Sequence, residues 1–346
     1  MLTGRLTIDL GAIAADWRAL DALTPPGCET AAVVKADAYG CGIAQVSRRL
    51  HEAGCRTFFV ATPGEGAALR SALGAAPEIH ILAGYSAAEE PVFRTQDLRP
   101  ILNAPGQVSD WLAGPAGSAI LQLDTGMNRL GMEPSELAAL GPLPPQITHL
   151  MSHLACADTP EHPQNAAQLS AFQKMTEGRH TGLTLAATAG ILLGPDYHFD
   201  MTRPGIGLYG GWPFDAGRHA VTVEVPILQI RDIAAGESVG YAAHYIATRD
   251  SRIATLAAGY ADGLIRQMGN SGTAMGVIHN RPVPFAGRVS MDLVTLDVTD
   301  VPEARPGDMV ELIGPNQSID ALAEMTGTIG HEILTSLGAR YDRIYL

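Results

Sequence analysis

The stretch AAVVKADAYGCGIAQVSRRLHEAGCRTFFVA, Ala31–Ala61, contains one complete unit of the pattern that decides the fold. The apolar run Ala31–Val34 predicts a buried strand, and Thr57–Ala61 predicts a second one. Between them, Ile43–Ala53 carries apolar residues at three- and four-residue steps, which predicts an amphipathic helix. A strand, a helix and a strand in this order indicate a βαβ unit with two parallel strands.

The same alternation continues from about Thr30 to Tyr209. It predicts eight strands: Ala31–Val34, Thr57–Ala61, Glu78–Leu82, Leu98–Leu102, Ser118–Leu123, Ile147–Ser152, Leu183–Ala187 and a run around Phe199–Met201. Helices are predicted between them, among them Ile43–Ala53, Gly64–Leu73, Pro134–Leu140 and Asn165–Glu177. Eight βα repeats of this size favour an α/β fold with an N-terminal (β/α)8 TIM barrel over an open doubly wound sheet.

The pattern differs on both sides of this barrel. Arg5–Leu10 predicts a strand, and Ala12–Leu23 predicts a helix capped near Asp9. After Gly210, Pro and Gly become frequent and Val221–Ile233 alternates, which predicts a C-terminal all-β domain. Its further strands are expected around Arg252–Leu256, Met275–His279, Val283–Phe285, Asp292–Val298 and Asp308–Ile313.

We expect the domain boundary within the Gly- and Pro-containing stretch GGWPFDAGRH, Gly210–His219. The predicted domains are therefore a barrel over residues 1–214 and a β domain over residues 215–346. Residues 5–23 could pack on the second domain.

Composition excludes several classes of function. The 346 residues carry 23 Lys and Arg against 36 Asp and Glu, a net charge of −13 without a basic cluster, which argues against binding to nucleic acid or to an anionic membrane. With 46% hydrophobic residues the chain can bury a large core, so disorder is excluded as its main state. No run approaches the ~20 apolar residues of a membrane span, and Met1–Leu10 does not resemble a secretory signal. We expect a cytoplasmic protein.

No metal site is expected. The cysteines show no CxxC spacing, so they are interpreted as reduced thiols. His149 and His153 are four residues apart, but their segment is predicted to be a strand and further ligands are lacking.

Lysine is scarce, since only Lys35 and Lys174 among the 23 Lys and Arg residues are lysine. A surface cation tolerates arginine, whereas an amine that forms a Schiff base does not, because guanidinium keeps its proton. Lys35 follows the predicted strand Ala31–Val34, at the end where barrel active sites gather. We interpret it as a Schiff-base lysine for an aldehyde cofactor, the alternative being a solvated lysine at a strand end. Lys174 is interpreted as a solvated residue on a helix.

Two further motifs follow predicted barrel strands. HFDMTRPGIGLYGG, His198–Gly211, contains a formal GxGxxG, but no helix is predicted after it. We interpret it as a Gly-rich loop suited to a phosphate, with Thr188 placed to help. LDTGMNRLG, Leu123–Gly131, places Arg129 past a strand end, where it could bind a carboxylate or phenolate or be an ordinary surface residue.

In the β domain, VGYAAHY, Val239–Tyr245, and GRVSMDL, Gly287–Leu293, are weak indications when taken singly. Together, however, VVKADAYG, DTGMNRLG, SHLA, RPGIGLYG, VGY, GYADG and GRVSMD stand in the order found in alanine racemases. The chain resembles this family from about Leu6 to Tyr345. The resemblance implies pyridoxal 5′-phosphate as cofactor, a homodimer with shared active sites, and two-base interconversion of L- and D-alanine that supplies D-alanine for peptidoglycan.

The likeness also implies roles for individual residues. Lys35 would hold the cofactor and act on the D-alanine face, and Tyr241 of the other subunit would act on L-alanine. His153 and Arg203 match the residues that support this tyrosine, and Arg203 would contact the pyridine nitrogen. The other matches are cofactor contacts at Tyr39, Arg129, Thr188, Gly205 and Ile206, substrate contacts at Arg129, Met291 and Asp292, and entry-channel residues at Tyr260, Arg266 and Arg288.

Three features depart from the family pattern. Gln122 stands where many members have a lysine that orients the arginine, and its oxygen could accept a weaker hydrogen bond from Arg129. Ala187 replaces a common asparagine, and the tail ARYDRIYL leaves open whether Tyr341 or Tyr345 contacts the phosphate. A broader-specificity amino-acid racemase and a non-catalytic pyridoxal-phosphate-binding protein remain as alternatives.

Overall fold

The computed structural model describes residues 3–346, apart from the side chain of Asn270. The chain forms two compact units: a barrel unit, Ile13–Gly217, and a sheet unit, which joins the described residues up to Ala12 to Arg218–Leu346. Of the segment 5–23, the strand therefore belongs to the sheet unit and the helix from Ile13 to the barrel unit. Within residues 3–346, no helix is long and apolar enough to cross a membrane.

Parallel strands form the centre of the barrel unit and close on themselves. β2 (Glu29–Thr30) and β3 (Ala32–Val33) are one run of chain on either side of Ala31. β2 pairs with β10 at one end of the sheet, and β3 pairs with β4 at the other end. Because β2 and β3 belong to the same run of chain, the sheet closes into a barrel. The predicted TIM barrel is thereby confirmed. Its other strands, in chain order, are β4 (Thr57–Val60), β5 (Glu78–Ile81), β6 (Arg99–Leu102), β7 (Ala119–Gln122), β8 (Ile147–Met151), β9 (Gly182–Ala187) and β10 (Met201–Arg203).

Six predicted strands agree with these bounds to within one residue at each end, whereas the first, Ala31–Val34, begins two residues earlier as β2 and the last differs as well. β10 begins at Met201, whereas the sequence predicted a run around Phe199–Met201. Phe199 has a positive φ of 53°, which is incompatible with extended backbone and delays the start of the strand. A core cluster within the barrel joins buried apolar side chains, one from each of six strand segments: Ala31, Phe59, Ile101, Ile120, Met151 and Met201.

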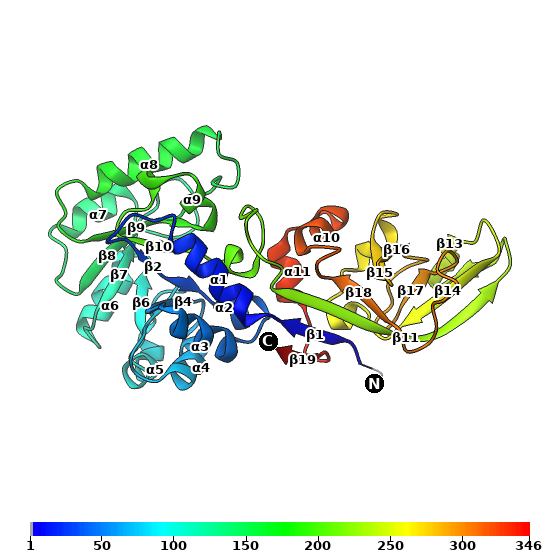
Figure 1. Ribbon diagram of the computed structural model, residues 1–346. Coiled ribbons are helices and arrows are strands. Elements are labelled where there is room, and N and C mark those ends of the chain that lie inside the picture. The colour runs from blue at the N-terminus through cyan, green and yellow to red at the C-terminus, as the bar shows by residue number, and fades with distance from the viewer. Residues whose placement is uncertain (1–2) are drawn as a thin grey trace. The chain divides into compact units, whose positions relative to one another are not determined.

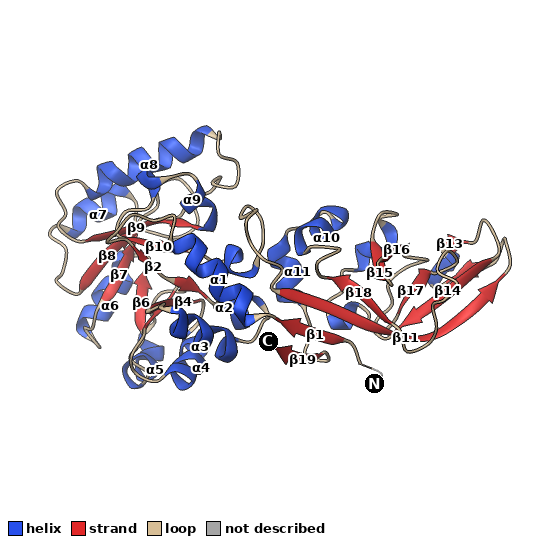
Figure 2. Ribbon diagram, in the orientation of Figure 1, coloured by secondary structure: helices blue, strands red, loops and turns tan. Residues whose placement is uncertain are grey.

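Helices lie around the barrel strands (Figure 1 and Figure 2). α3 (Ile43–Ala53) and α7 (Pro134–Leu140) have the predicted bounds. α4 (Pro63–Leu73) begins one residue earlier than predicted, because Thr62 caps it and proline suits the first helical position. The remaining elements are α1 (Leu10–Asp21), α2 (Lys35–Tyr39), η1 (Ala87–Glu89), α5 (Glu90–Thr95), α6 (Pro105–Ala113), α8 (Pro163–Thr176), α9 (Thr188–Leu192), η2 (Pro195–Tyr197) and η3 (Ile206–Tyr209).

The sheet unit is organised by one long strand, β11 (Val221–Ile233), whose bounds match the predicted alternating segment. Its first half pairs antiparallel with both β1 (Arg5–Ile8) and β18 (Met309–Ile313), and its second half pairs antiparallel with β14 (Ser251–Leu256). The other strands are β12 (Ser238–Val239), β13 (Tyr245–Ile246), β15 (Met275–Ile278), β16 (Arg281–Pro284), β17 (Val294–Asp297) and β19 (Asp342–Tyr345).

The sheet unit is mostly sheet, but it is not all-β as predicted, because it also contains α10 (Ile319–Thr326) and α11 (Gly330–Ser336). The cap residues of α10 were visible in the sequence: Ser318 Oγ accepts from the Ala321 amide at 3.1 Å, and Gly327 ends the helix with a φ of 71°. Three short 3₁₀ turns complete the unit: η4 (Tyr241–Ala243), η5 (Tyr260–Asp262) and η6 (Arg266–Asn270).

Candidate active site

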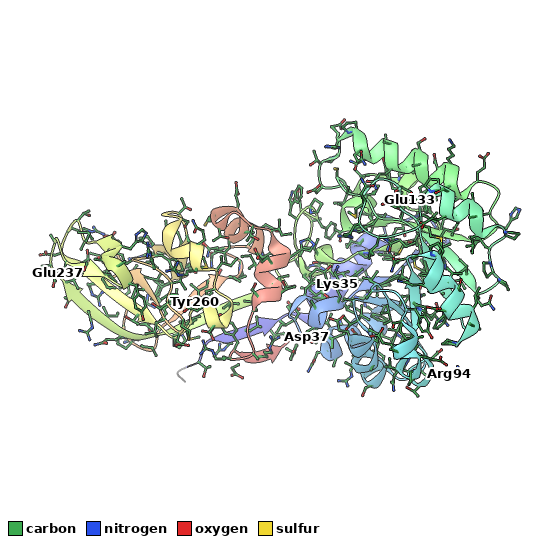
Figure 3. The ribbon with its side chains drawn as sticks, turned by 180° about the vertical axis from the view of Figure 1, so that it is seen from behind. Lys35, Asp37, Arg94, Glu133, Glu237 and Tyr260 are labelled. Carbon is green, nitrogen blue, oxygen red and sulfur yellow. The ribbon has the colours of Figure 1, made fainter. Side chains whose placement is uncertain are left out.

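Lys35 is presented by an unusual turn at the carboxyl end of the first barrel strand. It is the first residue of α2, and Asp37 follows in the same turn (Figure 3). The four residues Ala36–Tyr39 all have φ between 53° and 56°, so the turn is left-handed although none of them is glycine. Left-handed backbone costs roughly 1–2 kcal/mol for each such residue, so other contacts must hold the turn. The predicted place of Lys35 is confirmed, whereas the handedness was not predicted.

Four predicted site residues of the barrel unit interact electrostatically. The pKa of the Lys35 amine is lowered by burial and by Arg129, against the opposing effect of Glu65. The pKa of His153 falls to about 3 through burial, with Arg203, Arg129 and Lys35 adding to the effect. His153 is therefore neutral near pH 7, and the positive charge is carried by its neighbours.

Arg203 ends β10 and is almost completely buried. It donates to the Thr184 hydroxyl, to the Ser152 carbonyl at 2.8 Å and to the Leu185 carbonyl at 3.2 Å. Burial lowers the pKa of its guanidinium to about 9, which still leaves it protonated at neutral pH. Among the ion pairs of residues 3–346, Arg203 has no carboxylate partner. A buried cation without an acidic neighbour favours an anionic or electron-rich ligand.

Tyr39, Thr188 and the loop Gly205–Ile206 lie together at the same end of the barrel. Thr188 Oγ1 accepts from the amides of Gly205 at 3.0 Å and Gly207 at 3.2 Å. A side chain at position 205 would overlap the Tyr39 hydroxyl, so this close approach requires glycine. The Gly205 amide is thus bonded to Thr188, whereas the Ile206 amide has no acceptor among the described residues.

Arg129 lies in a compact loop that follows β7. Asp124 Oδ1 accepts three successive amides, from Gly126, Met127 and Asn128, and these bonds shape the loop. The expected bond from Arg129 to the oxygen of Gln122 is absent from the hydrogen bonds of the described residues. Instead the Gln122 amide group donates to the Leu130 carbonyl at 3.1 Å, so it anchors the loop backbone rather than the arginine head.

The remaining predicted residues belong to the sheet unit. Tyr241 is 70% exposed and follows Gly240, whose φ is 75°. Met291 is 54% exposed, and its carbonyl accepts from the Ala261 amide at 2.9 Å. The Asp292 carboxylate accepts from Arg340 Nη1 at 2.7 Å, and its place beside a substrate carboxylate stays a prediction.

The predicted entry-channel residues and the two C-terminal tyrosines also lie in the sheet unit. Tyr260 begins η5 and is 44% exposed (Figure 3). Arg266 begins η6, and Arg288 is partly buried. The Tyr341 ring is buried against Gly4, and Tyr345 ends β19 beside β1.

Sequence reasoning missed three residues around these sites. Glu65 bonds the turn that carries Lys35, and Thr184 bonds Arg203. Arg340 forms two 2.7 Å bonds to the carboxylate of Asp262 in addition to its bond to Asp292. For Glu65 the sequence did contain an indication, because Thr62 and Glu65 have the spacing of a capping box.

Comparison with known proteins covers the whole chain. Residues 8–213 match the alanine racemase N-terminal domain, and residues 220–345 match the alanine racemase C-terminal domain. The chain belongs to the alanine racemase family. It is accordingly an amino-acid isomerase, as the motifs predicted.

Individual relatives are similar over nearly their full length. An alanine racemase from Jannaschia sp. (strain CCS1) is 53% identical over 347 residues, covering 99% of each chain. The crystal structure of alanine racemase from Bartonella henselae with covalently bound pyridoxal phosphate matches with a TM-score of 0.93 at 39% identity, covering 99% of each chain. The biosynthetic alanine racemase from Pseudomonas aeruginosa matches with a TM-score of 0.93 at 36% identity, covering 100% of each chain.

Proposed function

We propose that this protein interconverts L- and D-alanine with pyridoxal 5′-phosphate held at the carboxyl end of its barrel. The observation that carries the proposal is the group formed by Lys35, Arg129, His153 and Arg203, in a chain whose two halves both match alanine racemase domains. The lowered pKa of Lys35 raises the fraction of neutral amine, which is the form that attacks an aldehyde.

The residues present fit this cofactor. Three cations surround a neutral His153, and the buried one, Arg203, has no acidic partner within residues 3–346. The Thr188 hydroxyl accepts two amides and keeps its own proton to donate, and the Ile206 amide is a second donor beside it. These donors suit a phosphate. Pyridoxal phosphate supplies an aldehyde and an electron-withdrawing ring that acidify the α-proton of an amino acid.

The residues of the chain would then hold and move protons. Lys35 takes or returns the α-proton on the D-alanine face, and Tyr241 does so on the opposite face. Two groups are needed, because one base cannot readily reach both faces of a planar carbon centre. Arg203 would donate to the pyridine nitrogen and, since guanidinium keeps its proton, would leave that nitrogen unprotonated.

A second copy of the chain would supply Tyr241 and Met291 to each site. Large apolar and aromatic side chains are exposed on the sheet unit, namely Tyr241, Ile246, Tyr260, Met291 and Leu293. Exposed side chains of this kind mark interaction surfaces. We propose that the protein is a cytoplasmic homodimer and that the D-alanine it produces is used for peptidoglycan.

The experiment incubates the purified protein with L-alanine in deuterium oxide and follows both inversion and α-deuterium uptake. We expect inversion with deuterium incorporated at the α-carbon. Absence of inversion would refute the racemase assignment. Equal rates with larger amino acids would replace it with the broader-specificity racemase, and bound cofactor without exchange would replace it with the non-catalytic binding protein.

A further inference from the structure

We propose that Glu65 is a positioning residue that holds the left-handed turn bearing Lys35 and supplies a negative charge that acts on that amine. The proposal rests on the role of Lys35 given above. Glu65 lies in the first turn of α4, 29 residues from the lysine turn in sequence, and one oxygen of its carboxylate accepts from the Ala36 amide at 2.6 Å.

The second carboxylate oxygen is bound to a different loop. Glu65 Oε2 accepts from the amides of Ala61 at 2.8 Å and Thr62 at 3.2 Å, and Thr62 Oγ1 accepts in return from the Glu65 amide at 3.3 Å. In an ordinary capping box, the glutamate bonds only the amide that precedes its own helix. Here the same carboxylate also fastens the loop after β3 to the loop after β4.

The turn needs such a fastening. Four consecutive non-glycine residues, Ala36–Tyr39, are left-handed, which is an unfavourable backbone conformation for each of them. Within the turn, the Asp37 carboxylate accepts from the Ile43 amide at 2.7 Å and fixes its distal end. Glu65 fixes the proximal end, at the amide directly after Lys35. The Ala38 amide also donates to the Val34 carbonyl at 2.9 Å, so loss of the Glu65 bond would loosen the backbone directly after Lys35 rather than unfold the turn.

The negative charge of Glu65 raises the pKa of Lys35, whereas the cationic neighbour Arg129 lowers it. Arg129 faces Lys35 from the loop after β7, His153 lies past the end of β8, and Arg203 ends β10. Burial and Arg129 favour the neutral amine, whereas Glu65 favours the protonated form. Glu65 thus keeps Lys35 able to carry the proton that it must return, besides keeping it in place.

The two lysines of the chain allow a direct test. The full-length protein, freed of cofactor with hydroxylamine, is treated with a short pulse of acetic anhydride from about pH 6 to 11, and the acetylation of Lys35 and Lys174 is read from separate peptides. Lys174 is exposed on α8 and serves as the reference within the same molecule. The rate at which the protein takes up pyridoxal phosphate is measured in parallel.

Three variants separate position from charge. With Glu65→Gln we expect the reactivity midpoint of Lys35 to fall by about one pH unit and cofactor uptake to slow about 10- to 100-fold, while Lys174 is unchanged. Glu65→Asp keeps the charge, but its side chain is too short to span both loops. The reactivity midpoint of Lys35 should therefore equal that of the wild type, whereas cofactor uptake should be as slow as in Glu65→Gln. Glu52→Gln removes an exposed carboxylate on α3 and should change neither. In the loaded enzyme, kcat should fall for both Glu65 variants while KM for alanine stays constant.

Several results would overturn the proposal. It fails if Glu65→Gln moves neither the midpoint nor uptake, if Glu65→Asp takes up cofactor at the normal rate, or if only KM changes. Borohydride reduction of the loaded wild-type protein tests the underlying function separately. Cofactor mass on a peptide other than that of Lys35 would reject the role of Lys35, whatever the Glu65 variants do.

Discussion

The bond between Thr188 and the Gly205 loop predicts a defined loss when the hydroxyl is removed. Thr188→Val has nearly the same shape, so it should leave no cavity, but it removes the acceptor of two amides, at 3.0 Å from Gly205 and 3.2 Å from Gly207. The Thr188 side chain is buried, with 3% of the residue exposed, so water cannot replace the acceptor without local opening. A buried donor left without a partner costs about 1–3 kcal/mol, which gives about 2–6 kcal/mol for the two.

Hydrogen–deuterium exchange resolves this effect locally. If the loop opens more easily by the lower value of about 2 kcal/mol, exchange of the Gly205 and Gly207 amides should accelerate about 30-fold, since 1.4 kcal/mol corresponds to tenfold. A peptide spanning residues 201–210 reports both amides, and peptides from the sheet unit should be unchanged. Uptake of pyridoxal phosphate should weaken as well, because the donated hydroxyl proton is lost.

Thr188→Ser is the matched control, because it keeps Oγ1 and removes only the methyl group. It should retain the slow exchange of the wild-type loop. Wild-type protection in Thr188→Val would show that the two amides have another acceptor and would exclude this role of the Thr188 hydroxyl. Equal acceleration in Thr188→Ser would also refute it, because the methyl contact rather than the hydroxyl would be stabilising the loop.

Two further predictions concern stability. Phe59 is fully buried in the centre of the barrel, so Phe59→Ala should destabilise the protein by about 3–5 kcal/mol and lower the urea midpoint, whereas an unchanged midpoint would contradict this packing. Burial lowers the pKa of His80 in the folded protein, although Glu78 opposes this effect. In the unfolded chain the imidazole has its ordinary pKa of 6.5, so below about pH 6.5 the unfolded state binds the proton more readily than the folded state. The free energy of unfolding should therefore be unaffected by His80 above about pH 6.5. Below it, protonation of His80 should lower the free energy of unfolding by up to about 1.4 kcal/mol per pH unit. His80→Phe, whose ring can keep the stacking on Phe59 at 4.9 Å, should flatten urea titrations between about pH 6.5 and 5, and an unaltered slope would count against it.

The barrel could be predicted because its strands are short apolar runs separated by regular amphipathic helices, and both periods are local properties of the sequence. The place of Lys35 followed from the same reading. The handedness of its turn could not be predicted, because Ala36–Tyr39 contains no glycine and the contact that fixes its proximal end comes from Glu65, 29 residues away.

Polar partners in the sites show the same limit. Gln122 was expected to accept from Arg129, but it bonds the Leu130 carbonyl, a choice that depends on the loop folding back on its strand. The bond from Arg340 to the Asp292 carboxylate was not predicted either, because the two residues are 48 positions apart in the sequence. The residue types predicted that these side chains form hydrogen bonds, whereas the tertiary structure determines which residue is the partner.

If Lys35 and Tyr241 serve opposite faces of alanine, as proposed, removing the Tyr241 hydroxyl should stop proton transfer on one face alone. Tyr241→Phe is loaded with pyridoxal phosphate and incubated in deuterium oxide, separately with D- and L-alanine, and both α-deuterium uptake and configuration are followed. We expect D-alanine to exchange its α-hydrogen with retention, because Lys35 remains, while L-alanine exchanges little and neither enantiomer inverts. Inversion at the wild-type rate, or faster exchange of L-alanine than of D-alanine, would contradict the assignment of Lys35 and Tyr241 to opposite faces.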